Sequence, residues 1–183
     1  MKKLFVIILY AFSAGINAQA QSELTFKPFK FDISAGYALP SSGTSGSNGG
    51  FLLSLEPKYA LSDFLTLGIK AETAISITRN SMTDDNVQGS GSYLATADYY
   101  FSTNTIRPFA GAGIGIYTHA STYVNSIDEV TSKTKFGGSP RVGIEVAHFR
   151  AAVEYNFAGK VGDFRKDYIG IKMGVLIGGG RIE

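Results

Sequence analysis

Side chains that could perform acid–base or nucleophilic chemistry are few in this sequence. It contains two histidines, His119 and His148, and no cysteine. A nucleophilic enzyme needs a base within reach of a hydroxyl or thiol, and His119 has Ser121 and Thr122 beside it. That grouping is typical of a polar loop, whereas His148 falls in a short turn between two apolar stretches. We therefore predict no catalytic residues, and an enzyme that uses His119 as its base stays an alternative.

Two other groups of residues have the types, but not the spacing, of a ligand site. Asp84 and Asp85 are adjacent carboxylates, and a calcium ion takes six to eight oxygen ligands. Gly111, Gly113 and Gly115 lie two residues apart, whereas a dinucleotide-binding turn has the spacing G-x-G-x-x-G between a strand and a helix. The sequence predicts no metal site and no cofactor.

Eight segments of the sequence show the two-residue period of a β-strand, in which successive side chains point to opposite faces. In the first segment Phe29, Phe31 and Ile33 alternate with Lys30 and Asp32. One face of each segment is apolar, and the other carries charged residues and glycine. The predicted strands are residues 29–39, 51–61, 65–77, 92–101, 107–117, 136–146, 149–157 and 169–178.

Six basic and six acidic residues share the polar faces of these strands, so their charges can balance. If residues 147 and 148 form a two-residue turn, Glu145 lies opposite Arg150 and Arg141 lies opposite Glu154. A three-residue turn at 62–64 brings Glu56 opposite Lys70. The predicted charge network consists of Lys30, Asp32, Glu56, Lys58, Lys70, Glu72, Asp98, Arg141, Glu145, Arg150, Glu154 and Lys172.

The connections between the predicted strands alternate in length. Residues 40–50, 78–91, 119–135 and 158–167 form long polar loops, and the connections between them are short turns. Short turns at one end and long loops at the other are typical of a transmembrane barrel with an even number of strands. We predict an all-β fold, an eight-stranded antiparallel up-and-down transmembrane β-barrel with short periplasmic turns and long extracellular loops.

Alternation is equally compatible with a soluble lipocalin-like carrier, whose apolar face points inward around an apolar ligand. Three features favour the apolar face outward. Glycines recur on the polar face, as the crowded interior of an eight-stranded barrel requires. The charges on that face balance, so they can pair when they are buried. Aromatic residues lie near both ends of the strands, as in the girdles of membrane barrels. The soluble carrier of a small apolar ligand stays an alternative.

The N-terminus predicts export. Lys2 and Lys3 precede an apolar run at 4–15, and Ala18-Gln19-Ala20 has the small-x-small pattern of a signal-peptidase site. No later segment reaches the roughly 20 apolar residues of a spanning helix. Without the two lysines, the 15 remaining basic residues equal the 15 acidic ones. A net charge of zero gives no indication of a nucleic-acid partner.

Four stretches carry a family resemblance: ADYYF (97–101), RPFAGAGIG (107–115), RVGIEVAHFRAAVEYNF (141–157) and DYIGIKMGV (167–175). They resemble the small outer membrane β-barrel family of Gram-negative bacteria that includes OmpA-like and OmpX-like proteins. The terminal stretch 177–183 departs from the aromatic residue that frequently ends family members. The resemblance implies an integral outer membrane protein with a role in adhesion, envelope integrity or recognition through its exposed loops.

Together these patterns predict a signal peptide at 1–20, a short N-terminal tail at 21–28, the barrel at 29–178 and a C-terminal tail at 179–183. The expected protein is a non-enzymatic monomer with a closed polar lumen, surrounded by outer membrane lipids. An outer membrane lipid-modifying enzyme is a second alternative. The loops at 40–50, 78–91, 119–135 and 158–167 are the predicted contact sites for an extracellular or surface ligand.

Overall fold

A computed structural model describes residues 24–40, 49–78, 86–123, 126–161, 164–165, 167–180 and 182. The predicted signal peptide at 1–20, most of the first loop, and Asp84 and Asp85 lie outside these residues. The described chain forms ten strands: β1 (Phe29–Pro40), β2 (Gly50–Ala60), β3 (Leu65–Thr78), β4 (Asn86–Tyr100), β5 (Ile106–Tyr123), β6 (Ser126–Val146), β7 (Phe149–Asn156), β8 (Lys160–Val161), β9 (Phe164–Arg165) and β10 (Tyr168–Gly178).

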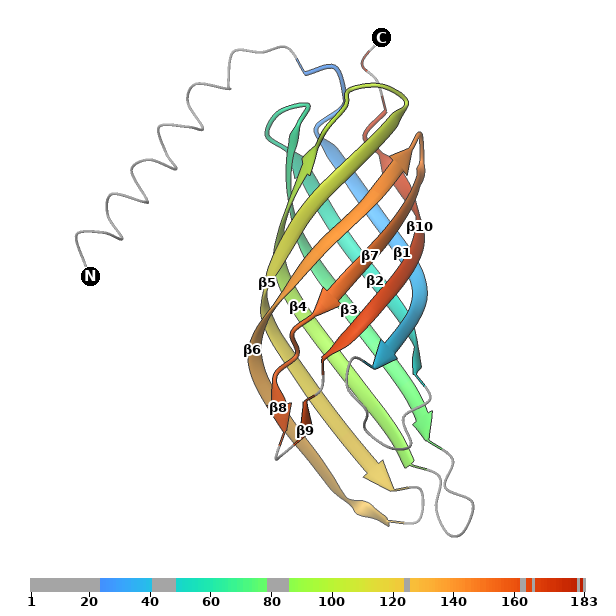
Figure 1. The fold of residues 1–183 in the computed structure, drawn as a ribbon, viewed down its shortest axis with the longest axis vertical. Coiled ribbons are helices and arrows are strands. Elements are labelled where there is room, and N and C mark those ends of the chain that lie inside the picture. The colour runs from blue at the N-terminus through green and yellow to red at the C-terminus, as the bar shows by residue number, and fades with distance from the viewer. Residues whose placement is uncertain are drawn as a thin grey trace, which may run out of the picture.

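Eight of the strands close into a barrel in the order β1-β10-β7-β6-β5-β4-β3-β2 (Figure 1). All neighbouring strands in the barrel are antiparallel. β8 and β9 pair only with each other, in a small hairpin between β7 and β10. The predicted fold, an eight-stranded antiparallel up-and-down barrel, is confirmed. Within the described ranges, no helix is long and apolar enough to cross a membrane.

The two faces of the barrel wall differ in exposure as the alternation predicts. In β2, Leu53 and Leu55 are 48% and 43% exposed, whereas Ser54 and Glu56 are 5% and 3% exposed. The apolar residues of the strands therefore point away from the barrel axis, and the charged residues point into the lumen. This burial pattern contradicts the lipocalin-like alternative, which needs an apolar interior.

The short turns at 61–64, 101–105 and 147–148 lie at one end of the barrel, together with both ends of the described chain (Figure 1). At the other end two loop predictions are wrong in extent. β4 begins at Asn86, inside the predicted loop 78–91, and residues 119–135 lie almost entirely in β5 and β6. These residues are polar at successive positions, so the two-residue period that reveals a half-buried strand is missing. The fourth predicted loop, 158–167, contains the hairpin of β8 and β9.

The strand registers follow from the short turns. The turn at 147–148 places Glu145 opposite Arg150 and Arg141 opposite Glu154, as predicted. In the β2–β3 pair, Leu55 lies opposite Ala71 and Lys58 lies opposite Gly68. These two pairs give the register that the three-residue turn at 62–64 predicts for Glu56 and Lys70.

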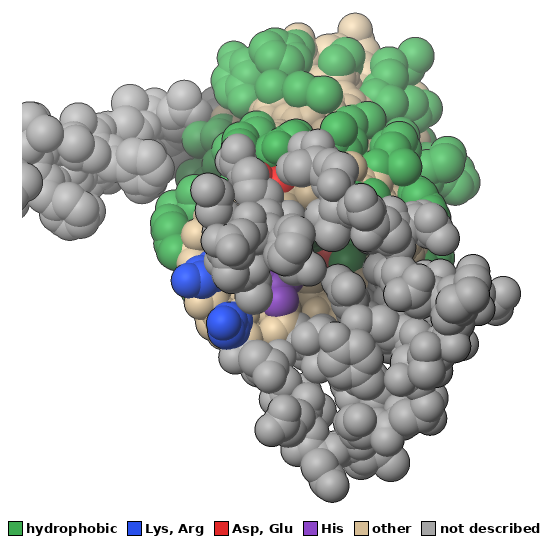
Figure 2. All heavy atoms as spheres, turned by 60° about the horizontal axis from the view of Figure 1, so that its bottom comes forward, with side chains coloured by type: hydrophobic (Ala, Val, Ile, Leu, Met, Phe, Trp, Pro, Cys, Tyr) green, Lys and Arg blue, Asp and Glu red, His purple; other side chains and the backbone are tan. Residues whose placement is uncertain are grey.

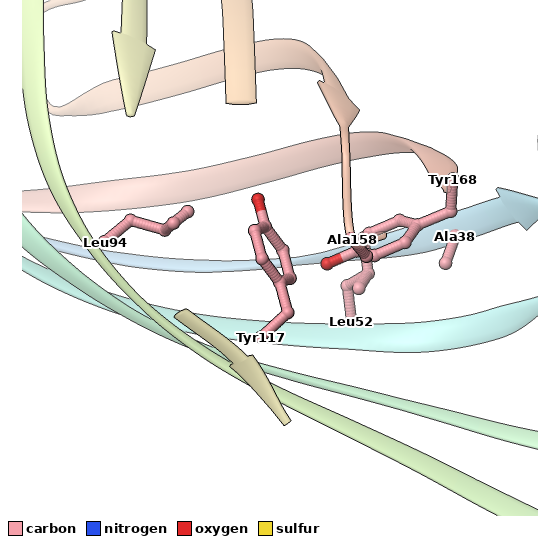
Figure 3. Packing of buried hydrophobic residues seen from close by; sticks show 6 residues of the cluster. All are labelled: Ala38, Leu52, Leu94, Tyr117, Ala158 and Tyr168. Atoms are coloured by element: carbon pink, nitrogen blue, oxygen red, sulfur yellow. The ribbon is translucent and has the colours of Figure 1, made fainter. Parts of the chain in front are cut away.

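Apolar side chains inside the lumen form two clusters. The larger cluster lies at the loop end and joins side chains from five different strands and one connection (Figure 3). It consists of Ala38, Leu52, Leu94, Tyr117, Ala158 and Tyr168. The smaller cluster lies toward the short turns and consists of Tyr100, Phe109 and Ala152.

Candidate functional site: the charged lumen

The twelve residues of the predicted charge network all lie inside the barrel. None of them is more than 4% exposed. They come from seven strands, because each strand that carries them turns its polar face inward. Arg107 of β5 is also buried, at 6% exposed, and it was missed because no other Asp, Glu, Lys or Arg lies on its face of β5.

Arg141 of β6 is the centre of the largest group of ion pairs. Its Nη2 atom is 2.7 Å from Oε1 of Glu56, and its Nε atom is 2.7 Å from Oδ1 of Asp98. A third carboxylate, that of Glu154, lies 3.6 Å from Nη1. The planar guanidinium has five N–H donors in a fixed arrangement, so it can donate to several carboxylates at once. The ammonium group of a lysine has only three donors.

Two further cations share the carboxylate of Asp98. Oδ2 of Asp98 lies 2.9 Å from Nζ of Lys58 and 2.9 Å from Nη2 of Arg150. Both cations also contact Asp32, at 3.6 Å from Lys58 and 3.2 Å from Arg150. The carboxylate of Asp32 accepts a further hydrogen bond from the hydroxyl of Ser34. Each buried charge in this layer is thus within reach of an opposite one.

A second layer of charges lies nearer the loop end. Lys70 contacts Glu154, and Lys172 lies 2.6 Å from Glu72 and 2.9 Å from Glu154. The hydroxyl of Tyr168 donates to Glu72 over 2.7 Å. Tyr168 also belongs to the apolar cluster at the loop end, so this side chain joins the charge network to that cluster.

A third layer lies nearer the short turns. Nζ of Lys30 is 2.8 Å from Oε2 of Glu145 and donates to the hydroxyl of Tyr100 over 2.8 Å. The Tyr100 hydroxyl in turn donates to Glu145 over 2.7 Å. Arg107 approaches the same carboxylate at 3.6 Å.

The shortest ion pairs cross the lumen instead of joining neighbouring strands. Arg141 in β6 and Glu56 in β2 are on opposite sides of the barrel, and so are Lys70 in β3 and Glu154 in β7. The predicted cross-strand pair Arg141–Glu154 is longer, at 3.6 Å. Glu145 and Arg150, the second predicted pair, are 3.7 Å apart. The register predicted which residues lie side by side, but the shortest ion pairs join strands that are not neighbours.

Glycines on the inner face make room for these side chains. A Cβ atom at Gly111 would collide with the carboxylate of Asp98 and with the carbonyl oxygen of Ala97. At Gly143 it would lie 2.6 Å from the ring of Phe109. The narrow interior of an eight-stranded barrel leaves no volume for both side chains. The alternating glycines at 111, 113 and 115 therefore belong to the lumen wall.

Sequence reasoning also missed three tyrosines of the lumen. Tyr100, Tyr117 and Tyr168 are buried, and the Tyr117 hydroxyl donates to Oδ1 of Asn156 over 2.9 Å. A usable signal existed, since Tyr100 follows Asp98 at two residues and Tyr117 follows Gly115 at two residues. Their aromatic character suited the lipid face equally well, so type alone did not assign them.

The two histidines lie at opposite ends of the barrel. Nε2 of His119 is 3.0 Å from the carbonyl oxygen of Ala158, and Nδ1 of His148 is 3.0 Å from that of Leu176. The side chains of Ser121 and Thr122 lie outside the described part of the structure. In the described part, no three His, Cys, Asp or Glu side chains are grouped as metal ligands.

The outer surface of the barrel is a continuous set of exposed apolar side chains. Ile69, Ile114 and Met173 are 65%, 60% and 73% exposed. Aromatic side chains flank this belt: those toward the short turns include Phe29, Tyr59, Tyr99 and Phe101, and those toward the loops include Tyr37, Phe51, Tyr93 and Phe157. An apolar band bounded by two aromatic girdles is the surface that a barrel presents to lipid.

An apolar exterior and an interior crossed by a network of ion pairs define the class: this is the fold of a transmembrane β-barrel of the small outer membrane type. No protein-family model matches the sequence, and no curated protein matches it. Among solved structures the chain is similar to Neisserial surface protein A, with a TM-score of 0.63 and 21% identity over 84% of this chain and 98% of that one. It is also similar to Ail, the attachment invasion locus protein of Yersinia pestis, in complex with the heparin analogue sucrose octasulfate. That TM-score is 0.54, with 15% identity over 85% of this chain and 100% of Ail. At these identities the likeness concerns the fold.

Proposed function

We propose that this chain is an integral, non-enzymatic protein of the outer membrane, with a closed lumen and with its loop end facing outside. In this proposal it serves recognition, adhesion or envelope integrity through that end. The observation that carries the proposal is the arrangement of the barrel wall, which has an apolar belt on its outer face and charged side chains on its inner face. Such a wall is stable only where lipid surrounds it, because water would meet a large exposed apolar surface.

Membrane insertion is tested by gel mobility of the protein from washed outer membranes, with and without boiling. A folded barrel resists the gel detergent until it is heated, so the two samples are expected to migrate differently. A protein that stays in the aqueous periplasmic fraction and shows no heat-dependent shift would contradict the proposal.

Orientation is tested with single cysteines, because the chain has none of its own. Thr134→Cys places a thiol at an exposed position of the loop end, and Asn104→Cys is the matched position in a short turn. An impermeant maleimide added to intact cells is expected to label Thr134→Cys alone. Labelling of Asn104→Cys alone would show the opposite orientation.

The closed lumen is supported by the ion pairs that cross it, such as Arg141 to Glu56. An interior of eight strands is filled by side chains, whereas aqueous pores have about 16 strands. Single-channel recording in a planar bilayer is therefore expected to show no large, stable conductance. A steady conductance of porin size would contradict the closed lumen.

A second candidate function is recognition of a polyanion at the loop end. Lys133 and Lys135 are exposed on the same face of β6, and Lys133 lies opposite His119 of β5. Figure 2 shows exposed basic side chains beside a histidine at this end. Ail, which has a similar fold, is described in complex with a heparin analogue. Paired cations on one strand face suit the sulfate or phosphate groups of such a ligand.

The probe for this candidate is sucrose octasulfate, titrated by calorimetry into the detergent-solubilised protein. The double variant Lys133→Gln/Lys135→Gln is expected to bind at least about fivefold more weakly, because two charge-assisted contacts are lost. Lys27→Gln, which removes an exposed lysine at the other end, is the control. Equal binding by the double variant and the unsubstituted protein would reject this candidate.

A further inference from the structure

Residues 24–28, which precede β1, are held by hydrogen bonds at the short-turn end of the barrel. The amide of Lys27 donates to the carbonyl of Gly180 over 2.8 Å, and the amide of Ile182 donates to the carbonyl of Thr25 over 2.9 Å. On its other side, the amide of Thr25 donates to the Asp63 carboxylate, at 2.9 and 3.2 Å from its two oxygens. Residues 24–28 are thus held between the C-terminal residues and the β2–β3 turn.

The side chain of Phe26 reaches the opposite wall of the barrel. It contacts Arg107 of β5, and β5 is the fourth neighbour of β1 in either direction around the barrel. The guanidinium carbon of Arg107 lies 4.3 Å from the centre of the Phe26 ring and 4.1 Å from that of Tyr100. A guanidinium between two aromatic faces is stabilised by both rings. Residues 24–28 therefore cross the opening of the lumen.

Arg107 is also fixed by the two short turns on either side. Nη2 donates to the carbonyl of Asp63 over 2.6 Å, and Nε donates to the carbonyl of Ser102 over 3.4 Å. The same guanidinium lies 3.6 Å from Glu145, whose carboxylate binds Lys30. Phe26 consequently lies next to the third layer of the charge network, the one nearer the short turns.

We propose that residues 24–28 form a strap that closes the short-turn end of the lumen, with Phe26 as the closing side chain and Arg107 as its receptor. The strap keeps water from the Lys30–Glu145 pair, whose attraction is stronger when water is excluded. It also fastens the first strand of the barrel to the last one, through the hydrogen bonds of Lys27 and Ile182.

The strap is separable from the barrel itself. The ladder between β1 and β10 ends with Lys30 opposite Gly178, so the barrel closes without residues 24–28. Glu145 keeps Lys30 and Tyr100 as partners when the strap is displaced. A substitution in the strap is therefore expected to open this end while the barrel stays folded.

The test measures amide hydrogen exchange of Thr25, Lys27 and Ile182 by NMR in detergent micelles. In the unsubstituted protein these amides are expected to be protected relative to an unstructured peptide. Phe26→Ala is expected to speed their exchange about 5- to 30-fold, the range for loss of one cation–π contact. Phe29→Ala is the matched control, because Phe29 is an exposed residue on the outer face, and it is expected to change the rates less than about twofold.

Three outcomes would overturn the proposal. The first is an unprotected set of amides in the unsubstituted protein, since no strap would then be formed. The second is equal exchange in Phe26→Ala and the unsubstituted protein, or equal acceleration by Phe29→Ala. The third is loss of the heat-dependent gel shift in Phe26→Ala, because the segment would then be part of the barrel and not a separable strap.

Discussion

The inner and outer surfaces of the barrel wall are built from alternate residues of the same strands, yet they are stabilised in different ways. Outside, Ile69 or Met173 needs no particular partner, because any apolar side chain suits lipid. Inside, Arg141 needs Glu56 and Asp98 at the correct distances. The outer surface therefore depends on the type of residue, and the inner surface depends on the identity and position of its partners.

This difference predicts how substitutions on the two surfaces behave. An outer position should tolerate any apolar residue and reject a charge. An inner position should reject even an apolar residue of suitable size, if its removal leaves partners unpaired. Substitutions on the two surfaces are compared by the urea concentration at which the barrel unfolds in detergent micelles.

The largest effect is expected for Arg141→Met. Methionine keeps much of the volume but leaves the buried carboxylates of Glu56 and Asp98 without their shortest ion pairs. Loss of one partner from a buried ion pair costs about 3 to 5 kcal/mol in the free energy of unfolding. Lys133→Met removes an exposed cation and serves as control. If both variants unfold at the same urea concentration, the lumen network does not stabilise the barrel.

A smaller effect is expected for Ile69→Arg on the outer surface. Ile69 pairs with Ala95, which lies between Tyr93 and Tyr99 on β4, so it sits between the two aromatic girdles. An arginine facing lipid near the middle of the membrane costs about 2 to 4 kcal/mol. Ile69→Leu, the apolar control, should be nearly neutral. On a water-exposed surface Ile69→Arg would also be nearly neutral, and that result would contradict the lipid-facing assignment.

The smallest effect is expected for Gly111→Ala. The added methyl group meets the Asp98 carboxylate and the Ala97 carbonyl, so the inner wall must shift. Overpacking of this kind costs about 1 to 3 kcal/mol. Gly91→Ala is the matched control, since a Cβ atom there has no heavy atom within 4 Å. A neutral Gly111→Ala would show that the lumen has spare volume at this level.

The fold was predictable because the alternation in most strands is complete. In β1 and β2 the apolar and polar residues separate without exception between positions 29 and 35 and between 53 and 59. The register of β6 and β7 was predictable too, because a two-residue turn fixes which residues face one another. Local period and local turn geometry depend only on neighbours in the sequence.

The loop ends of β4, β5 and β6 were not predictable by the same reasoning. Residues 86–91 and 126–135 are mostly polar and do not alternate between apolar and polar types. A two-residue alternation of apolar and polar residues arises only where the two faces of a strand have different surroundings. The burial of Arg107 was missed for a related reason. No other charged residue alternates with it on the inner face of β5, so the strand shows no charged pattern.

The sequence by itself determined the eight strands of the barrel and the inward face on which twelve of its charges lie. These follow from the period of two and from the cost of burying an unpaired charge. Only the tertiary structure decided that Lys70 contacts Glu154, that Arg141 contacts Glu56 and that Phe26 reaches Arg107. Such partners are far apart in the sequence and meet only because closure of the barrel brings opposite walls within the length of two side chains.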